Sequence, residues 1–126
     1  MRFVPTLLAL LVLPATTLSA QDQAAPRTVE VQLSSFDFTP STINLRAGQP
    51  VTLHLANTGN GGHNFSAPEF FAASSGVSGP VARGAVEVSG HQSVDVSLTP
   101  ARGTYRLKCT HTLHTSFGMR GAIVVE

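Results

Sequence analysis

Apolar and polar residues alternate along most of this sequence, in runs too short to form helices of ordinary length. Residues 51–57 give the clearest example, because every second residue from Val51 to Leu55 is a large apolar one. A period of two places neighbouring side chains on opposite faces, so such runs predict half-buried strands. The pattern predicts about seven or eight strands, with runs at residues 28–33, 35–40, 42–46, 51–57, 85–89, 93–98, 105–109 and 122–125.

Turn-forming residues separate these runs, and only one segment favours a helix. Pro68 opens residues 68–75, which suit one or two helical turns, with Phe70 and Phe71 covering an edge of the core. Residues 75–83, rich in Gly, Ser and Pro, are interpreted as a loop, and Gly90-His91 as a hairpin turn. Many short strands with almost no helix are typical of a two-sheet antiparallel β-sandwich of Greek-key type.

The N-terminus has the features of an export signal. Met1-Arg2 carries a positive charge, residues 7–13 form an apolar run, and Leu18-Ser19-Ala20 matches a signal-peptidase site. The run is shorter than the ~20 apolar residues that a membrane-spanning helix needs, and no cysteine stands at the cleavage point to carry a lipid anchor. We therefore expect a periplasmic or secreted protein without a membrane anchor, divided into a signal peptide (1–20), a flexible lead-in (21–27) and one folded domain (28–126).

The charge balance argues against several classes of partner. The formal net charge is +1, and loss of Arg2 with the signal leaves seven cationic and seven acidic side chains. The densest basic group, formed by Arg102, Arg106 and Lys108, is spread along one strand face. This composition favours neither nucleic acid nor an anionic membrane as a partner. The chain is expected to be a monomer.

The only cysteine lies in a stretch that combines three kinds of metal ligand. Cys109 faces the same side as the apolar residues of its strand, and the chain then passes His114 and Met119 before the next strand. In an exported protein a single cysteine forms no internal disulfide, and a metal bond would protect its thiol from oxidation. Thiolate, imidazole and a weak thioether suit copper, and the methionine favours copper over zinc. Such a site requires one more imidazole, which His63 in Gly61-Gly62-His63-Asn64-Phe65 offers.

These residues resemble the cupredoxins, the small blue-copper proteins. The match consists of His63-Asn64, Cys109, His114 and Met119, followed by Gly121-x-Ile123-x-Val125, and it extends from about Val29 to the C-terminus. The spacing C-x4-H-x4-M is similar to that of auracyanins and azurins. The resemblance implies a cupredoxin sandwich that binds one type 1 copper ion through His63, Cys109, His114 and Met119.

One feature departs from the family pattern. Many cupredoxins carry proline beside the second histidine ligand, whereas Leu113 and Thr115 flank His114 in this sequence. The departure leaves the ligand assignment unchanged but implies a less rigid loop, from which copper is lost more easily.

The three remaining histidines are interpreted as surface or neighbouring groups. His54 lies on the outward face of its strand, and His91 lies in a turn. His111 follows Cys109 with one residue between them. This spacing would strain the chelate ring that forms when both side chains bind the same metal ion. We therefore expect His111 near the site and His114 as the ligand.

The resemblance also implies a role for Asn64. In cupredoxins the residue after the first histidine ligand is often Asn, and its side chain ties that loop to the residue after the ligand cysteine, which is Thr110 here. Such ties hold metal ligands in position. A backbone N–H from the loop after Cys109, donated to its sulfur, would raise the reduction potential of the metal.

The function expected from these features is electron transfer without catalysis. One copper ion would cycle between Cu(I) and Cu(II), and His114 would lie at an apolar docking patch formed with Leu113, Phe117, Gly118 and residues 59–62, which redox partner proteins contact transiently. The alternative is a copper chaperone or buffer that delivers or sequesters copper. An oxidase or nitrite reductase would need further copper ligands and a second domain or a trimer interface, and a metal-free adhesion sandwich would leave the Cys, His and Met grouping unexplained.

The spacing argument for the histidines leads to a direct test. We expect His111→Ala to keep an intense visible absorption band with bound Cu(II), and His63→Ala to lose it, because His63 is a predicted ligand and His111 is not. Absorption spectra and copper stoichiometry of both variants measure the difference. Loss of copper in His111→Ala together with its retention in His114→Ala would reverse the assignment of the second histidine.

Overall fold

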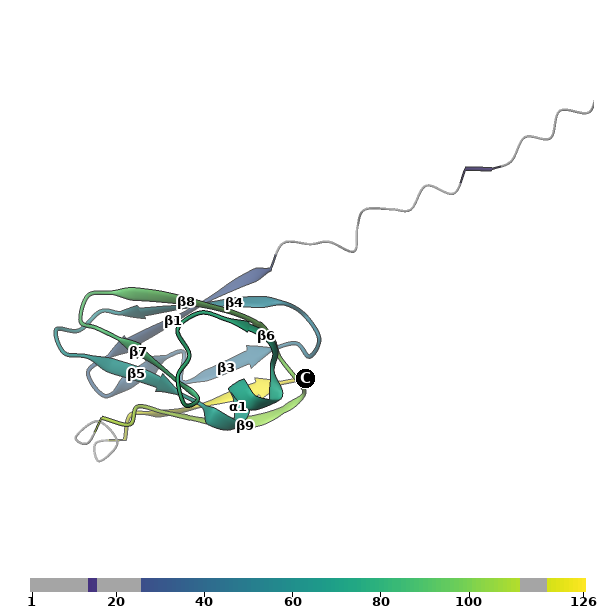
Figure 1. Ribbon diagram of the computed structural model, residues 1–126. Helices are drawn as coiled ribbons and strands as arrows, with labels where there is room; N and C mark the ends of the chain where they lie inside the picture. Colours follow the sequence, from purple (N-terminus) through teal and green to yellow (C-terminus); the bar gives the residue numbers. More distant parts are fainter. Residues whose placement is uncertain (1–13, 16–25, 112–117) are drawn as a thin grey trace, which may run out of the picture.

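Ten strands and one helix form in the part of the chain that the computed structural model describes, residues 14–15, 26–111 and 118–126 (Figure 1). In order they are β1 (Arg27–Ser34), β2 (Asp37–Thr39), β3 (Thr42–Leu45), β4 (Val51–Asn57), β5 (His63–Ser66), α1 (Pro68–Ala73), β6 (Ser75–Ser78), β7 (Ala85–Val88), β8 (Ser93–Thr99), β9 (Gly103–Lys108) and β10 (Arg120–Val125). Within these described ranges, no helix has the length and apolar composition that crossing a bilayer requires.

The strands form two five-stranded sheets that face each other. Sheet A has the strand order β2-β1-β4-β8-β6, and sheet B has the order β3-β10-β9-β5-β7. The alternation seen in the sequence reappears in the burial of side chains, since Val51, Leu53 and Leu55 of β4 are buried and the residues between them are only partly covered. The predicted sandwich with one short helix is thus confirmed, and α1 begins at Pro68 with Phe70 and Phe71 buried, as expected.

The two sheets are mixed, however, and not purely antiparallel as predicted. β1 pairs in parallel with β4, and β3 pairs in parallel with β10. Parallel neighbours need a long crossover connection. Residues 35–50 provide one between β1 and β4, because they form β2 in sheet A and then cross to β3 in sheet B before returning.

The turn at Gly90-His91 was expected to close a hairpin, and this prediction is wrong. β7 pairs with β5 in sheet B, whereas β8 pairs with β4 in sheet A, so the turn carries the chain between sheets. A Cβ on Gly90 would lie 2.1 Å from the backbone oxygen of Asn60, and His91 adopts a φ of 58°. The two loops approach each other so closely at Gly90 that only glycine fits there.

Two short strands were absent from the prediction because their burial does not alternate. All four residues of β6 are exposed at the edge of sheet A, where Gly and Ser indicated a loop. All four residues of β5 are buried, so this strand is covered on both faces. A strand covered on both faces gives no period of two.

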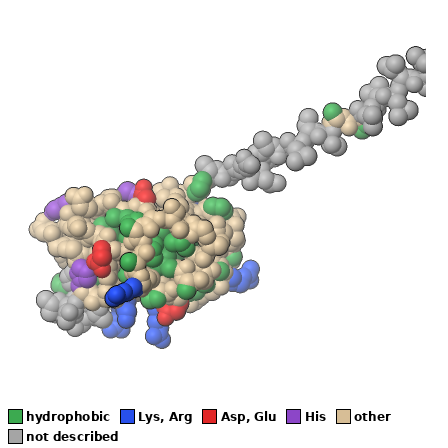
Figure 2. All heavy atoms as spheres, in the orientation of Figure 1, with side chains coloured by type: hydrophobic (Ala, Val, Ile, Leu, Met, Phe, Trp, Pro, Cys, Tyr) green, Lys and Arg blue, Asp and Glu red, His purple; other side chains and the backbone are tan. Residues whose placement is uncertain are grey.

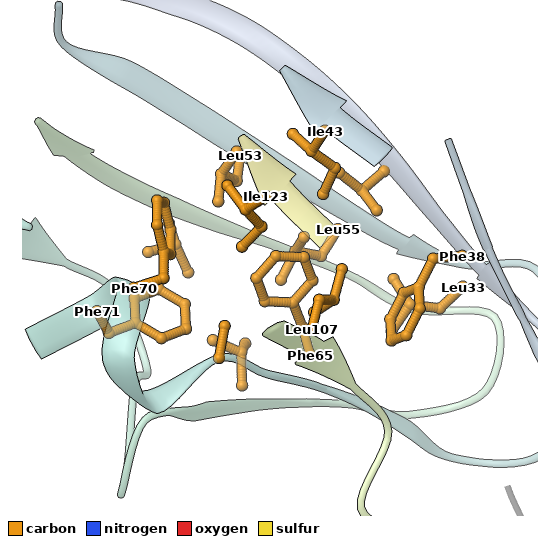
Figure 3. Packing of buried hydrophobic residues seen from close by; sticks show 14 of the residues in the cluster. Leu33, Phe38, Ile43, Leu53, Leu55, Phe65, Phe70, Phe71, Leu107 and Ile123 are labelled. Carbon is orange, nitrogen blue, oxygen red and sulfur yellow. The ribbon is translucent and has the colours of Figure 1, made fainter. Parts of the chain in front are cut away.

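Phe65 of β5 lies in the middle of the core, between the two sheets (Figure 3). Its ring is fully buried and packs edge-on against Phe38 and Phe71, with ring centroids 6.1 and 6.0 Å apart. The strand that carries His63 is therefore anchored in the core two residues further along the chain. A displacement of Phe65 would disturb both the core and the position of His63.

We expect Phe65→Ala to lower the free energy of unfolding by about 3–5 kcal/mol, because the change removes a buried ring and leaves a cavity. Urea denaturation measures the loss, with an unchanged m-value as evidence that the folded state persists. Val77→Ala is the matched control, since Val77 is 39% exposed, and its effect should stay within about 0.5 kcal/mol. Equal effects of the two substitutions would contradict the central position of Phe65.

Candidate metal centre

Three chain segments meet where β5 begins, β9 ends and β10 begins. β5 and β9 are antiparallel with Ser66 opposite Lys108, and β9 and β10 are antiparallel with Lys108 opposite Arg120. One residue beyond this register, the backbone N–H of Cys109 donates to the carbonyl oxygen of Met119 at 3.1 Å. The pairing of the strands thus brings His63, Cys109 and Met119 to the same end of sheet B.

The side chains of these three predicted ligands are removed from solvent. His63 is 3% exposed, and Cys109 and Met119 are completely buried. His63 points to the same side of β5 as Phe65, because side chains two residues apart share a face. Two sulfur atoms and an imidazole therefore lie inside the end of the sandwich.

Asn64 connects β5 to the segment after β9 through its backbone and its side chain. Its backbone N–H donates to Sγ of Cys109 at 3.4 Å. Its side-chain amide donates from Nδ2 to Oγ1 of Thr110 at 2.6 Å, and its Oδ1 accepts from the backbone N–H of Thr110 at 2.8 Å. The structure thus shows the expected tie between Asn64 and Thr110. The N–H that reaches the sulfur here comes from β5; residues 112–117, in the loop from which we expected it, lie outside the described residues.

Glu87 of β7 extends this network toward the surface. It lies opposite Asn64 in the β5–β7 pairing, accepts from Nδ2 of Asn64 at 2.9 Å, and contacts Nε2 of His111 at 3.0 Å through its other oxygen. Partial burial raises the pKa of Glu87, but the hydrogen bonds from Asn64 and His111 and the charge of His111 outweigh this effect and hold the pKa below its usual value. One carboxylate thus joins both segments that carry predicted ligands.

The loop before His63 is organised by Asn57, whose role the sequence analysis missed. Its buried side chain donates to the backbone oxygens of Gly61 and Val88 at 2.8 and 2.9 Å, and it accepts from the N–H of Gly59 at 2.9 Å. A polar residue at an inward position directly before a glycine-rich loop was the available signal. Glu87 was also missed, because the sequence does not reveal which residue pairs with Asn64.

The other histidines lie where the sequence analysis placed them. His54 is partly exposed and contacts Asp95 across the β4–β8 pair, with 2.6 Å between Nδ1 and Oδ1. His91 is exposed and its Nε2 lies 2.6 Å from Oδ1 of Asn60. His111 is partly exposed beside Glu87. His114 lies outside the described residues.

The donor set suits copper better than a hard cation. A thiolate and a thioether are soft ligands that favour copper, whereas Ca²⁺ and Mg²⁺ need several oxygen ligands. Among the described residues, no three His, Cys, Asp or Glu side chains gather as a metal-binding group. This result is consistent with the predicted set, because Met119 is none of these types and His114 is not described.

The hydrogen bonds of Asn64 lead to a prediction about stability and potential. We expect Asn64→Ala to lower the free energy of unfolding by about 1–3 kcal/mol, because groups that Asn64 satisfies lose their partner. We also expect a change in the reduction potential of the copper-loaded protein, measured by voltammetry. Asn44→Ala, at an exposed position of β3, is the control. Unchanged stability and potential in Asn64→Ala would show that the tie has no role.

Comparisons with known proteins agree with this architecture. A family model described as a cupredoxin-like domain matches residues 7–125. The structure of auracyanin B is 26% identical, with 82% of this chain and 92% of that chain covered and a TM-score of 0.61. Auracyanin A, a "blue" copper protein from Chloroflexus aurantiacus, is 24% identical over 81% of this chain and 100% of that chain, with a TM-score of 0.58.

The same fold also occurs within larger enzymes. A multicopper oxidase from Aquifex aeolicus is 16% identical, and the match covers 87% of this chain but 31% of that chain, with a TM-score of 0.63. A search among curated proteins gave no match. Since the family model spans nearly the whole sequence and the described strands form its sandwich, this chain belongs to the cupredoxin-like domain family.

Proposed function

We propose that this chain is a blue copper protein that transfers single electrons, with one copper ion held by His63, Cys109, His114 and Met119. The observation that carries the proposal is the burial of an imidazole, a thiol and a thioether at one end of sheet B. The similarity of the fold to the solved structures of auracyanin A and auracyanin B supports the proposal. Bound copper would supply a one-electron couple, Cu(I)/Cu(II).

The surroundings of the ligands favour electron transfer over catalysis. The side chains of Cys109 and Met119 are fully buried and His63 nearly so, which leaves little room for a substrate to reach a metal ion held by them. The strand ends and the hydrogen bonds of Asn64 hold these ligands in place. Because ligands held in this way would move little when the oxidation state of a bound metal changes, the reorganisation energy of electron transfer would be small. Multicopper oxidases share the fold, but a catalytic role would require copper ligands beyond this set.

Asn64 is positioned to tune the potential. Its backbone N–H points at Sγ of Cys109, and a hydrogen bond to a ligand sulfur withdraws electron density from it and so stabilises the reduced state. This contact belongs to β5 and does not depend on residues after Cys109. We therefore propose that β5 sets part of the reduction potential.

The partner-binding surface proposed here is the end of the sandwich near residues 59–62. His114, Leu113 and Phe117 belong to the expected patch but lie outside the described residues. Phe36, which the sequence analysis did not include, is 39% exposed in the turn between β1 and β2. The backbone N–H of Thr58 donates to Leu33 at the end of β1, so this turn lies at the same end. Such a surface would suit transient contacts with redox partner proteins. We propose that the chain makes these contacts as a monomer, in the periplasm or outside the cell.

The decisive test compares retention of copper with its release. We expect Met119→Leu to keep copper and colour over repeated oxidation and reduction, with a raised potential, because an axial thioether is a weak donor. We expect Cys109→Ser to lose the intense absorption, since the thiolate is the source of the charge-transfer band. Spectroelectrochemistry measures both variants against the wild type.

The same experiment distinguishes the alternative role of copper delivery. An electron carrier must hold its metal in both states, so the reduced wild-type protein should keep copper in the presence of a modest Cu(I) chelator. Release of copper to the chelator on reduction would favour a copper carrier. Intense visible absorption in Cys109→Ser would overturn the ligand assignment itself.

A further inference from the structure

The outer face of sheet B carries a concentration of positive charge beside the candidate metal centre. Arg106 and Lys108 of β9 and Arg120 of β10 are exposed and line one open hollow of about 640 Å³ together with Ser66, Pro68 and Glu69. These three are among eight Lys and Arg residues in a chain whose formal net charge is only +1. With Glu69 counted, the residues that line the hollow carry a formal charge of +2, which exceeds the net charge of the whole chain.

Two of the three cations face each other across a pair of strands. Lys108 and Arg120 are directly opposite each other in the antiparallel β9–β10 pair, and like charges in this position destabilise a sheet. Arg106 lies two residues before Lys108 on the same face, about 7 Å along the strand. In the described part of the chain, none of the three forms an ion pair, and Glu69 is the one acidic residue that lines the hollow.

Figure 2 shows Lys and Arg side chains projecting from the lower side of the molecule, the side on which β9 lies in Figure 1. Lys108 and Arg120 are the chain neighbours of the predicted ligands Cys109 and Met119. Because the side chains of Cys109 and Met119 are fully buried, a partner seated on these cations would lie close to both without touching either. None of the residues that line the hollow belongs to the patch expected from the sequence.

We propose that this hollow docks an acidic protein surface, one that presents several Asp or Glu carboxylates. Three exposed cations spread over two strands match a row of carboxylates better than one small anion, because Arg106 and Lys108 alone are about 7 Å apart along β9. Relief of the repulsion between Lys108 and Arg120 would add to the attraction. The proposal does not rest on copper binding, since none of the three cations is a predicted ligand.

The test uses the purified full chain and a fluorescein-labelled oligoglutamate peptide, with binding followed by fluorescence anisotropy at low ionic strength. We expect wild-type protein to bind the peptide and to lose most of the affinity at physiological salt, where exposed charges are screened. Arg106→Gln combined with Arg120→Gln should weaken binding about fivefold. An oligolysine peptide should not bind.

Two further variants make the result specific. Arg27→Gln combined with Arg46→Gln removes the same charge from exposed positions that line a different hollow, and should change the affinity by less than about twofold. Glu69→Gln should tighten binding, because it removes an acidic side chain that lines the hollow. Circular dichroism spectra confirm that each variant is folded.

Three outcomes would overturn the proposal: no binding by the wild type, equal losses in both double variants, or weaker binding in Glu69→Gln. Equal losses would show that net charge alone attracts the peptide. Because the measurement needs no copper, its failure leaves the electron-transfer proposal standing, and a failure of copper binding leaves this result valid.

Discussion

The hydrogen bonds of Asn64 are the interaction on which the candidate metal centre depends. β5 is buried on both faces, and a polar residue is stable in such a strand only when its groups are paired. Asn64 meets this condition by bonding to Cys109, Thr110 and Glu87, which belong to two neighbouring segments of sheet B. The requirement to satisfy one buried amide therefore fixes the relative positions of the chains that carry His63 and Cys109.

Around this tie, the core and the loop before His63 have different roles. Strand pairing and Phe65 hold the ligand-bearing segments from inside the core, and Asn57 shapes the loop that approaches His63 from outside. A fold of this kind does not determine a function, and enzymes share it. What distinguishes this chain is the chemistry gathered at one end, where two sulfur-bearing residues and a histidine are all buried.

Much of this arrangement could be predicted because it follows local rules. The alternation in β4 and in β9 indicated which side chains face the core, and proline at the start of residues 68–75 indicated the helix. The features that escaped prediction depend on which strands become neighbours. The parallel pairs, the crossing at Gly90-His91, the roles of Asn57 and Glu87 and the existence of β5 all arise from contacts between residues far apart in the sequence. The assignment of His63, Cys109, His114 and Met119 as metal ligands stays a prediction, and His114 lies outside the described residues.

The parallel pairing of β3 with β10 has a consequence for how the protein folds. It joins Thr42 to Ala122 and Leu45 to Val125, so sheet B cannot be completed until the last strand of the chain is available. β10 also separates β3 from β9 in the strand order, and its first residue follows Met119. Chains dominated by such distant pairings fold in milliseconds to seconds. A nascent chain that lacks β10 would therefore have neither a finished sheet nor the strand pairing that brings Met119 beside Cys109. If these residues hold a metal ion as proposed, its binding would be coupled to the completion of sheet B.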